Sequence, residues 1–413
     1  MKIVNGHVFI NGEKFEKGIL EIDKIHITHF YPCENYYNLN IDCKLNSDLT
    51  NHGIFCDQNI LDATGCYVVP GFIDVHFHGC VGEDFSDGHF DGLNKMAVYE
   101  LQNGITSICP ATMTLPEETL MQVVSNGKLM AQSESCEKMS NLLGFHLEGP
   151  FISKKKKGAQ DDKYILAPDI AMFRRLLDAS DGYLKLTTIA PEIPGAMEFI
   201  EAFHKEVSIS LGHTSTDYET AFLAFQAGAN HVTHLFNAMP PLHHRESGLI
   251  GAAFDALSEK PIYTELICDG VHVSDPIIRS AFALFSDKSI VLISDSMRAT
   301  GMPDGVYSLG GQEVSVKGNQ ATLKDGTLAG SVTNLYNCFL HAVKIGIPLE
   351  SALKAVTINP AKSIGVDKDY GSISTGKVAD LLVLNSDLTI RDIIFHGERL
   401  ALFSFKKRTY YDS

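Results

Sequence analysis

Short apolar runs alternate with amphipathic stretches through the central part of the chain, from about residue 70 to residue 368. Runs of this length, bounded by Gly, Pro or Asp, are typical of buried strands. Eight of them follow one another: VVPGFIDV (68–75), ITSICP (105–110), LLGFHLEG (142–149), LKLTTIAPE (184–192), VSISLGHT (207–214), NHVTHLF (230–236), IYTELICDG (262–270) and SIVLISDS (289–296).

The stretches between these runs carry apolar residues at helical spacing. Several begin at Asp or Pro and end near Gly, as capped helices do. They include DGLNKMAVYELQNG (91–104), PDIAMFRRLLDAS (168–180), PGAMEFIEAFHKE (194–206), TDYETAFLAFQAG (216–228) and DPIIRSAFALFSD (275–287). This alternation predicts an α/β protein, a (β/α)8 TIM-like barrel over residues 70–368, with a doubly wound open sheet as the alternative.

The two ends of the chain have a different pattern. Residues 1–69 hold short alternating pieces such as KIVNGHVFI and GILEIDKIHIT, separated by Gly and Asn turns. Residues 369–413 have the same texture, so we expect both ends to complete one small β domain. The segment 302–326, MPDGVYSLGGQEVSVKGNQATLKDG, has hairpin-like alternation and is expected at the barrel mouth.

Composition narrows the class of protein. The chain is 45% hydrophobic and 20% charged, which suits a globular protein with a substantial core. Its formal net charge of -16 argues against a general nucleic-acid or anionic-membrane partner. The N-terminal residues lack the apolar core of a signal peptide, and the nine cysteines form no CxxC pair. We therefore expect a cytoplasmic protein.

Metal-ligating residue types collect where the predicted strands end. Active sites of such barrels lie at the carboxyl ends of the strands. There the chain carries His76 and His78 on the first strand, Glu148 on the third, His213 on the fifth, His234 on the sixth and Asp295 on the eighth. Each alone has an ordinary structural explanation, but together they form the N/O ligand set of zinc or a similar divalent metal.

Other catalytic chemistries have weaker support. The chain contains no GxSxG motif, and Cys80 and Cys109, near the expected mouth, have no matching sulfur partners. We interpret both cysteines as small structural residues. Asp295 is instead our candidate for a carboxylate that takes a proton from water activated by a metal.

Several motifs make a family resemblance recognisable. The chain resembles the N-acetylglucosamine-6-phosphate deacetylase family of the amidohydrolase superfamily through PGFIDVHFHG, HLEGPF, SLGHT, THLFNAMPPLHHRESG, CDGVH and SDSMRATGMPDG. The terminal GSISTGKVADLLVL resembles the segment that completes a small β-sandwich in amidohydrolases. The resemblance therefore implies a sandwich domain from residues 1–69 and 369–413.

The resemblance also implies a metal site and a reaction. A metal would be held by Glu148, His213 and His234, with Asp295 as catalytic acid and base. The His76 and His78 pair implies a second metal position that shares Glu148, hence two divalent metals per active site. Zinc or iron is expected, with manganese or cobalt as alternatives. The implied reaction converts N-acetylglucosamine 6-phosphate to glucosamine 6-phosphate and acetate, in amino-sugar catabolism or recycling.

Substrate contacts follow from the same resemblance. They are Ala159, Gln160, Asn237, Ala238, Arg245, His272, Leu328, Ala329 and Gly330. Gln160 stands where many relatives have His, and it can donate a hydrogen bond but cannot carry positive charge. A homodimer whose phosphate site is shared between subunits is also implied.

Other interpretations remain open at this point. The chain could be a catalytically silent barrel kept for binding or assembly, or a different amidohydrolase such as a cyclic-amide hydrolase or an adenine-type deaminase. We interpret the run Lys154 to Lys157 as a solvated loop, and His231, His243 and His244 as structural or supporting residues. The pattern does not distinguish the glucosamine, galactosamine and mannosamine epimers.

Overall fold

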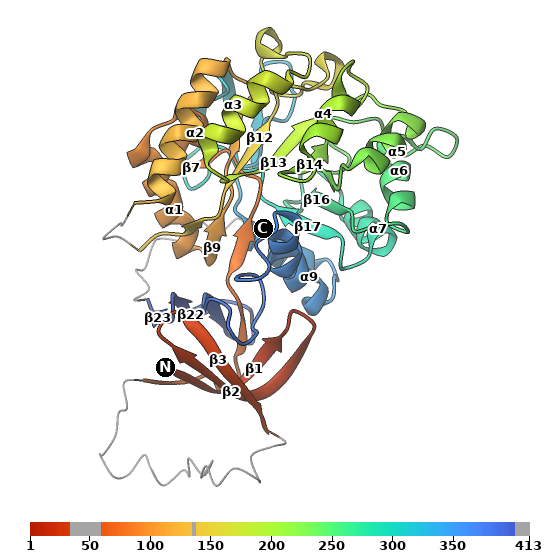
Figure 1. The fold of residues 1–413 in the computed structure, drawn as a ribbon. Helices are drawn as coiled ribbons and strands as arrows, with labels where there is room; N and C mark the ends of the chain where they lie inside the picture. Colours follow the sequence, from red (N-terminus) through yellow and green to blue (C-terminus); the bar gives the residue numbers. More distant parts are fainter. Residues whose placement is uncertain (34–58, 134–137, 401–413) are drawn as a thin grey trace, which may run out of the picture. The chain divides into compact units, whose positions relative to one another are not determined.

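The computed structural model describes residues 1–33, 59–133 and 138–400, which divide into two compact units (Figure 1). One unit comprises Met1–Gly71 together with the chain from Asp367, and the other comprises Phe72–Val366. Independent folding of the two as domains stays a prediction.

Strands from both chain ends form the sheet of the first unit. They are β1 (Lys2–Ile10), β2 (Lys14–Asp23), β3 (His26–Pro32), β4 (Ile60–Asp62), β5 (Tyr67–Pro70), β21 (Leu381–Leu384), β22 (Ile390–Phe395) and β23 (Glu398–Arg399). Their order is β23-β22-β21-β5-β1-β2-β3, with β4 beside β1. The pairing of Val69 with Leu382 joins the two ends of the chain. Alternate residues of these strands, such as Val68 and Leu381, make the unit's core. The two-layer sandwich stays a prediction.

Parallel strands form the centre of the second unit. They are β6 (Phe72–Asp74), β9 (Ile105–Ile108), β10 (Ala111–Thr112), β11 (Asn141–Leu142), β12 (Phe145–Glu148), β13 (Leu184–Ile189), β14 (Ser208–Leu211), β15 (His231–Val232), β16 (Tyr263–Ile267) and β17 (Ile290–Ile293). Seven of them form a curled sheet in the order β10-β12-β13-β14-β15-β16-β17, and β11-β9-β6 form another. All four residues of β17 are buried, as expected of a strand covered on both faces.

Helices lie outside these strands in Figure 1. They are α1 (Phe90–Gln102), α2 (Glu117–Ala131), α3 (Ile170–Ser180), α4 (Ala196–Phe203), α5 (Tyr218–Ala227), α6 (Gly248–Ala256), α7 (Asp275–Phe285), α8 (Leu335–Lys344), α9 (Leu349–Val356) and α10 (Ile358–Ser363). The predicted caps form, since the Asp169 and Asp217 side chains accept hydrogen bonds from Met172 N and Thr220 N. The five predicted helices are therefore confirmed.

Each of the eight predicted runs contains a strand, but the first run differs from the prediction. It is interrupted at Gly71, so β5 belongs to the first unit and β6 to the second. At the other end of the series, Asp295 N donates to His76 O at 3.0 Å, which joins the ends of the first and eighth runs. An open doubly wound sheet would keep such outer strands apart. The curled parallel sheet is consistent with a TIM-like barrel.

A three-stranded antiparallel sheet follows β17, as the alternation predicted. Its strands are β18 (Gly305–Leu309), β19 (Gln312–Lys317) and β20 (Gln320–Thr322). Within the described residues, no helix is both long and apolar enough to span a bilayer.

Candidate metal centre

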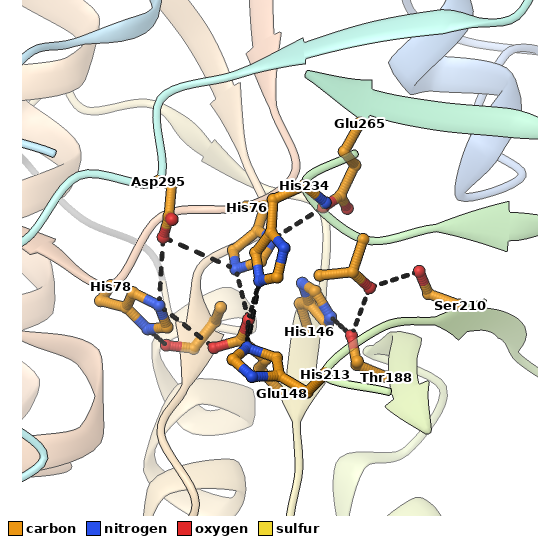
Figure 2. A network of polar contacts seen from close by, with 12 residues as sticks. His76, His78, His146, Glu148, Thr188, Ser210, His213, His234, Glu265 and Asp295 are labelled. Carbon is orange, nitrogen blue, oxygen red and sulfur yellow. Dashed lines mark hydrogen bonds and ion pairs between the residues drawn. The ribbon is translucent and has the colours of Figure 1, made fainter. Parts of the chain in front are cut away.

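The six side chains predicted as ligands meet at the carboxyl ends of their strands (Figure 2). His76 and His78 follow β6, Glu148 ends β12, His213 follows β14, His234 follows β15, and Asp295 follows β17. All six are buried. Residues separated by up to 219 positions in the sequence therefore converge, as the barrel prediction requires.

Glu148 is the centre of the cluster. Its Oε1 lies 3.1 Å from Nε2 of His213 and 3.1 Å from Nε2 of His234. The same oxygen lies 3.4 Å from Nε2 of His76, and Oε2 lies 3.3 Å from Nε2 of His78. One carboxylate thus faces two pairs of imidazoles, which is the arrangement of a bridging ligand.

Asp295 lies beside the pair from the first strand. Its Oδ1 is 3.3 Å from Nε2 of His78 and 3.9 Å from Nε2 of His76. Its backbone carbonyl accepts a hydrogen bond from Ser331 N at 2.7 Å, so the carboxylate is held between β17 and the following segment.

The backbone at three of these positions is left-handed. The φ angles are 46° at His213, 27° at His234 and 47° at Asp295. L-residues adopt this conformation rarely, at a cost of about 1–3 kcal/mol each. In a regular strand the side chains point alternately to the two faces of the sheet. The left-handed residue at the strand end changes the direction of its side chain from this alternation.

The other ring nitrogen of each histidine lies beside an oxygen. His76 Nδ1 is 2.8 Å from Glu265 Oε2, and His78 Nδ1 is 3.2 Å from Ala111 O. His213 Nδ1 is 2.8 Å from Lys156 O, and His234 Nδ1 is 3.2 Å from Asn237 O. A proton on each Nδ1 would satisfy these oxygens, and a cation that displaced the proton from each Nε2 would meet four lone pairs directed at the same carboxylate.

This arrangement fits a metal. The Nε2 atoms of His213 and His234 lie 3.0 Å apart, and two lone pairs at that distance repel unless a cation lies between them. Three groups of ligand atoms are close enough to hold an ion: His76, His78 and Glu148; Glu148, His213 and His234; and His76, His146 and Glu265. Nitrogen and carboxylate donors suit zinc and similar divalent metals.

Both carboxylates of the predicted site are ionised at neutral pH. Burial alone would raise the pKa of Glu148. The imidazoles of His76 and His213 outweigh this effect and hold the pKa well below its ordinary value. Asp295 behaves likewise, with the His78 imidazole lowering its pKa against the effect of burial. Conversely, burial lowers the pKa of His78, but Asp295 and Glu148 raise it to about 10. The centre holds negative charge that protons or a cation must balance.

A layer of polar side chains beneath the predicted ligands was not anticipated from the sequence. Glu265 lies within β16 with none of its surface exposed, between His76 and His231. His146, in β12, has its ring 4.4 Å from that of His76 and contacts Thr188 Oγ1 at 2.8 Å through Nε2. The available signal was a charged residue inside the apolar run IYTELICDG.

Gln160 contacts the ligand carboxylate directly. Its Nε2 donates to Glu148 Oε2 at 2.6 Å, while its Oε1 accepts from Thr114 N at 2.7 Å. Ala159, before it, accepts a hydrogen bond from the Gln312 side chain. The lysine run before this segment also contributes to the centre, but through the backbone oxygen of Lys156 rather than through its charges.

The segment 328–330 lies close to Asp295. A Cβ atom on Gly330, where φ is 70°, would meet the backbone oxygen of Asp295 at 3.1 Å. Ala329 is buried in a small apolar cluster with Met113 and Met297, and Leu328 pairs with Thr322. The structure thus places this predicted segment beside the centre.

The remaining predicted contacts differ in their placement. Asn237 donates through Nδ2 to the backbone oxygen of His234 at 3.3 Å, and Ala238, with φ 51°, accepts from Thr214 N at 3.1 Å. His272 Nδ1 lies 2.8 Å from Asp269 Oδ2. Arg245 lies on the exposed stretch 241–246. The structure therefore does not bring Arg245 into contact with the six ligands.

Cys80 and Cys109 are fully buried, and burial raises the pKa of each thiol. Both therefore stay protonated at neutral pH, which suits a structural role.

Comparison with known proteins identifies the class that this fold and centre define. The model of the Amidohydrolase family matches residues 67–407. The chain therefore belongs to the amidohydrolase family.

Its relatives indicate the branch of that family. The chain is 39% identical over 333 residues to the N-acetylglucosamine-6-phosphate deacetylase of Bacillus subtilis (strain 168), covering 80% of this chain and 83% of that protein. It is 34% identical to the N-acetylgalactosamine-6-phosphate deacetylase of Escherichia coli O157:H7, over 80% of this chain and 86% of that protein. The crystal structure of N-acetylglucosamine-6-phosphate deacetylase from Pasteurella multocida superimposes with a TM-score of 0.84 at 30% identity, covering 97% and 99% of the two chains. The resemblance to N-acetylglucosamine-6-phosphate deacetylases is confirmed.

Proposed function

We propose that the chain hydrolyses N-acetyl-D-glucosamine 6-phosphate to D-glucosamine 6-phosphate and acetate, in amino-sugar catabolism or recycling. The observation that carries this proposal is the convergence of four Nε2 atoms and two ionised carboxylates at the strand ends, in a chain similar to deacetylases over four-fifths of its length. A silent barrel would be expected to lose some of these donors, whereas all six are present here.

We infer that two divalent metals are bound when the enzyme is active. His213, His234 and Glu148 would hold one, and His76, His78 and Glu148 would hold the other. A divalent metal at such a centre polarises the amide carbonyl and lowers the pKa of water. Zinc or iron would serve, and manganese or cobalt has the same ligand preferences.

Asp295 would move the proton. Its carboxylate is ionised, so it can accept a proton at Oδ1 when water attacks the acetamide carbonyl. The same oxygen would then return the proton to the sugar nitrogen, since an amine leaves poorly without one. Its position 3.3 Å from His78 Nε2 and beside the 328–330 segment supports this role.

Side chains around the centre would orient the substrate. Gln160 would fix Glu148 and lie close to the acetamide, Asn237 and Ala238 would line the sugar with residues 328–330, and His272 and Arg245 would bind the hydroxyl and phosphate groups. Arg245 lies on an exposed stretch, which suits a phosphate site shared with a second subunit of a homodimer. We place the enzyme in the cytoplasm, where its free thiols stay reduced.

The 6-phosphate of N-acetylgalactosamine is a second candidate substrate, because one relative at 34% identity carries that name. Acetate release should be measured with the epimeric N-acetylhexosamine 6-phosphates and with unphosphorylated N-acetylglucosamine, adding Zn²⁺, Fe²⁺, Mn²⁺ or Co²⁺ singly. We expect the glucosamine 6-phosphate derivative to give the highest kcat/KM. A chain that binds metal stoichiometrically but releases acetate from none of these compounds would contradict the proposal.

A further inference from the structure

A second buried carboxylate lies directly behind the ligands. Glu265 Oε2 accepts a hydrogen bond from His76 Nδ1 at 2.8 Å and another from the backbone N–H of His234 at 3.1 Å. Its Oε1 lies 3.3 Å from Nε2 of His231. Glu265 therefore links the side chain of His76 to the backbone of His234.

Burying this charge is expensive. Glu265 is fully enclosed in the middle of β16, with Thr264 before it and the apolar Leu266 and Ile267 after it. A buried ionised carboxylate costs several kcal/mol unless hydrogen bonds and charges compensate it. A leucine would suit the apolar surroundings but would leave the ring N–H of His76 and the backbone N–H of His234 without their acceptor, so the side chain is explained by its contacts with the centre.

The contact with His76 has a chemical consequence. A carboxylate accepts but does not donate, so the proton of the His76 ring must lie on Nδ1. The lone pair is then on Nε2, which points toward Glu148 Oε1 at 3.4 Å. The second contact supports the backbone at His234, where φ is 27°.

An alternative use of the same atoms is a third metal held by His76, His146 and Glu265. The geometry favours a hydrogen bond, because 2.8 Å between His76 Nδ1 and Glu265 Oε2 is the usual length of one. The ring of His146 packs edge-on against His76 and its Nε2 contacts Thr188.

We propose that Glu265 is a positioning residue that sets the affinity of the metal position formed by His76, His78 and Glu148. This inference rests on the two-metal centre of the proposed function. The position formed by Glu148, His213 and His234 depends less on Glu265, since the Nδ1 atoms of its histidines contact backbone oxygens instead.

The test compares Glu265→Gln and Glu265→Met with the wild-type chain. Metal-free protein is titrated with Zn²⁺ against a competing chelator, and metal per chain is measured by elemental analysis. We expect two equivalents in wild type. In Glu265→Met we expect a loss of about 10- to 100-fold in affinity at the position formed by His76, His78 and Glu148, and a smaller loss at the other position, where Glu265 contacts only the backbone N–H of His234. The metal affinity of Glu265→Gln should lie between those of wild type and Glu265→Met, because the amide oxygen of Gln can still accept a hydrogen bond from His76 Nδ1.

Turnover supplies a second readout. Activity of both variants should rise toward wild type as free Zn²⁺ is increased, whereas a merely structural defect would not respond to metal. Glu100→Gln is the matched control: Glu100 is also buried in this unit, and its hydrogen bond is to Cys80 rather than to a ligand. It should bind two metals with unchanged affinity.

The outcomes separate this inference from the proposed function. Two equivalents bound with unchanged affinity in both Glu265 variants would overturn the positioning role and leave the deacetylase intact. A single equivalent in wild type, with acetate still released, would overturn it together with the two-metal centre. A third equivalent lost on substitution of Glu265 would show that Glu265 is itself a ligand, which also overturns the proposal.

Discussion

Gln160 donates through Nε2 to Oε2 of Glu148 at 2.6 Å, and this bond restrains the central carboxylate of the cluster. The other end of the amide is held by the N–H of Thr114. Both contacts are buried, so Gln160 restrains the position of the Glu148 carboxylate.

Gln160→Ala should therefore weaken metal binding as well as catalysis. It leaves the buried N–H of Thr114 without its acceptor, at a cost of about 1–3 kcal/mol, and removes one of the contacts that hold Oε2 of Glu148. We expect metal affinity to fall by about 10-fold, measured by chelator competition, and kcat to fall with it. Unchanged metal affinity and kinetics would remove Gln160 from the centre.

Asp295→Asn should separate proton transfer from metal binding. The amide keeps the shape of the side chain but cannot accept the proton, so kcat should fall by about 10²- to 10⁴-fold. Metal content should stay close to wild type, because Glu148 and the four imidazoles remain. Acetate release and elemental analysis on the same preparation give both values, and near-normal turnover would defeat the assignment.

Chelation should abolish turnover and lower the melting temperature. Metal that binds only the folded chain stabilises it by about 2.7 kcal/mol at a hundred times its Kd. Readdition of Zn²⁺, Fe²⁺, Mn²⁺ or Co²⁺ should restore both properties. Turnover that persists after the metal content has fallen to zero would exclude the proposed chemistry.

Arg245→Glu should discriminate between phosphorylated and unphosphorylated substrates. Reversing the charge would remove the proposed ion pair with phosphate, so we expect kcat/KM for the 6-phosphate to fall by at least about 10-fold. The unphosphorylated amide should be little affected. Lys205→Glu is the control, since Lys205 is also exposed but precedes β14, away from the ligand end. Equal losses for both substrates would contradict a phosphate role.

The Asp269 and His272 pair should make stability depend on pH in two directions. Burial raises the pKa of Asp269, but the hydrogen bond from His272 and its charge outweigh this and lower it. Burial lowers the pKa of His272, but Asp269 raises it above its ordinary value. The stability contributed by the lowered pKa of Asp269 is lost as pH falls through the pKa of this carboxyl in the folded chain. The stability contributed by the raised pKa of His272 is lost as pH rises through the pKa of this imidazole in the folded chain.

Asp269→Asn tests this window and keeps an acceptor for the N–H groups of Val271 and His272. The melting temperature of wild type minus that of the variant should be largest near neutral pH and shrink on both sides. Glu313→Gln, at an exposed ion pair with Lys324, should give a small difference at every pH. A difference for Asp269→Asn that does not change with pH would contradict the pairing.

Local patterns were sufficient for most elements of the second unit. Apolar periodicity and Asp caps located the helices, as Asp169 and Asp217 show. The run 68–75 was more difficult, because a continuous apolar stretch gives no sign that Gly71 divides it between two sheets.

The convergence of the six predicted ligand side chains was predictable because parallel strands bring their carboxyl ends together. The contacts that hold these side chains in place could not be predicted from the sequence. Glu265 contacts His76 from within β16 rather than from the carboxyl end of that strand, so the rule that located the other side chains does not include it. The contact between Gln160 and Glu148 likewise depends on how a loop folds back over the strand ends.

The left-handed backbone at His213, His234 and Asp295 has a consequence for engineering. Glycine would relax the chain at each of these three points, while deleting a side chain of the proposed metal centre. Relief of backbone strain and loss of metal binding therefore act in opposite directions, so a glycine at one of these points should raise the melting temperature of the metal-free chain but not of the metal-loaded one.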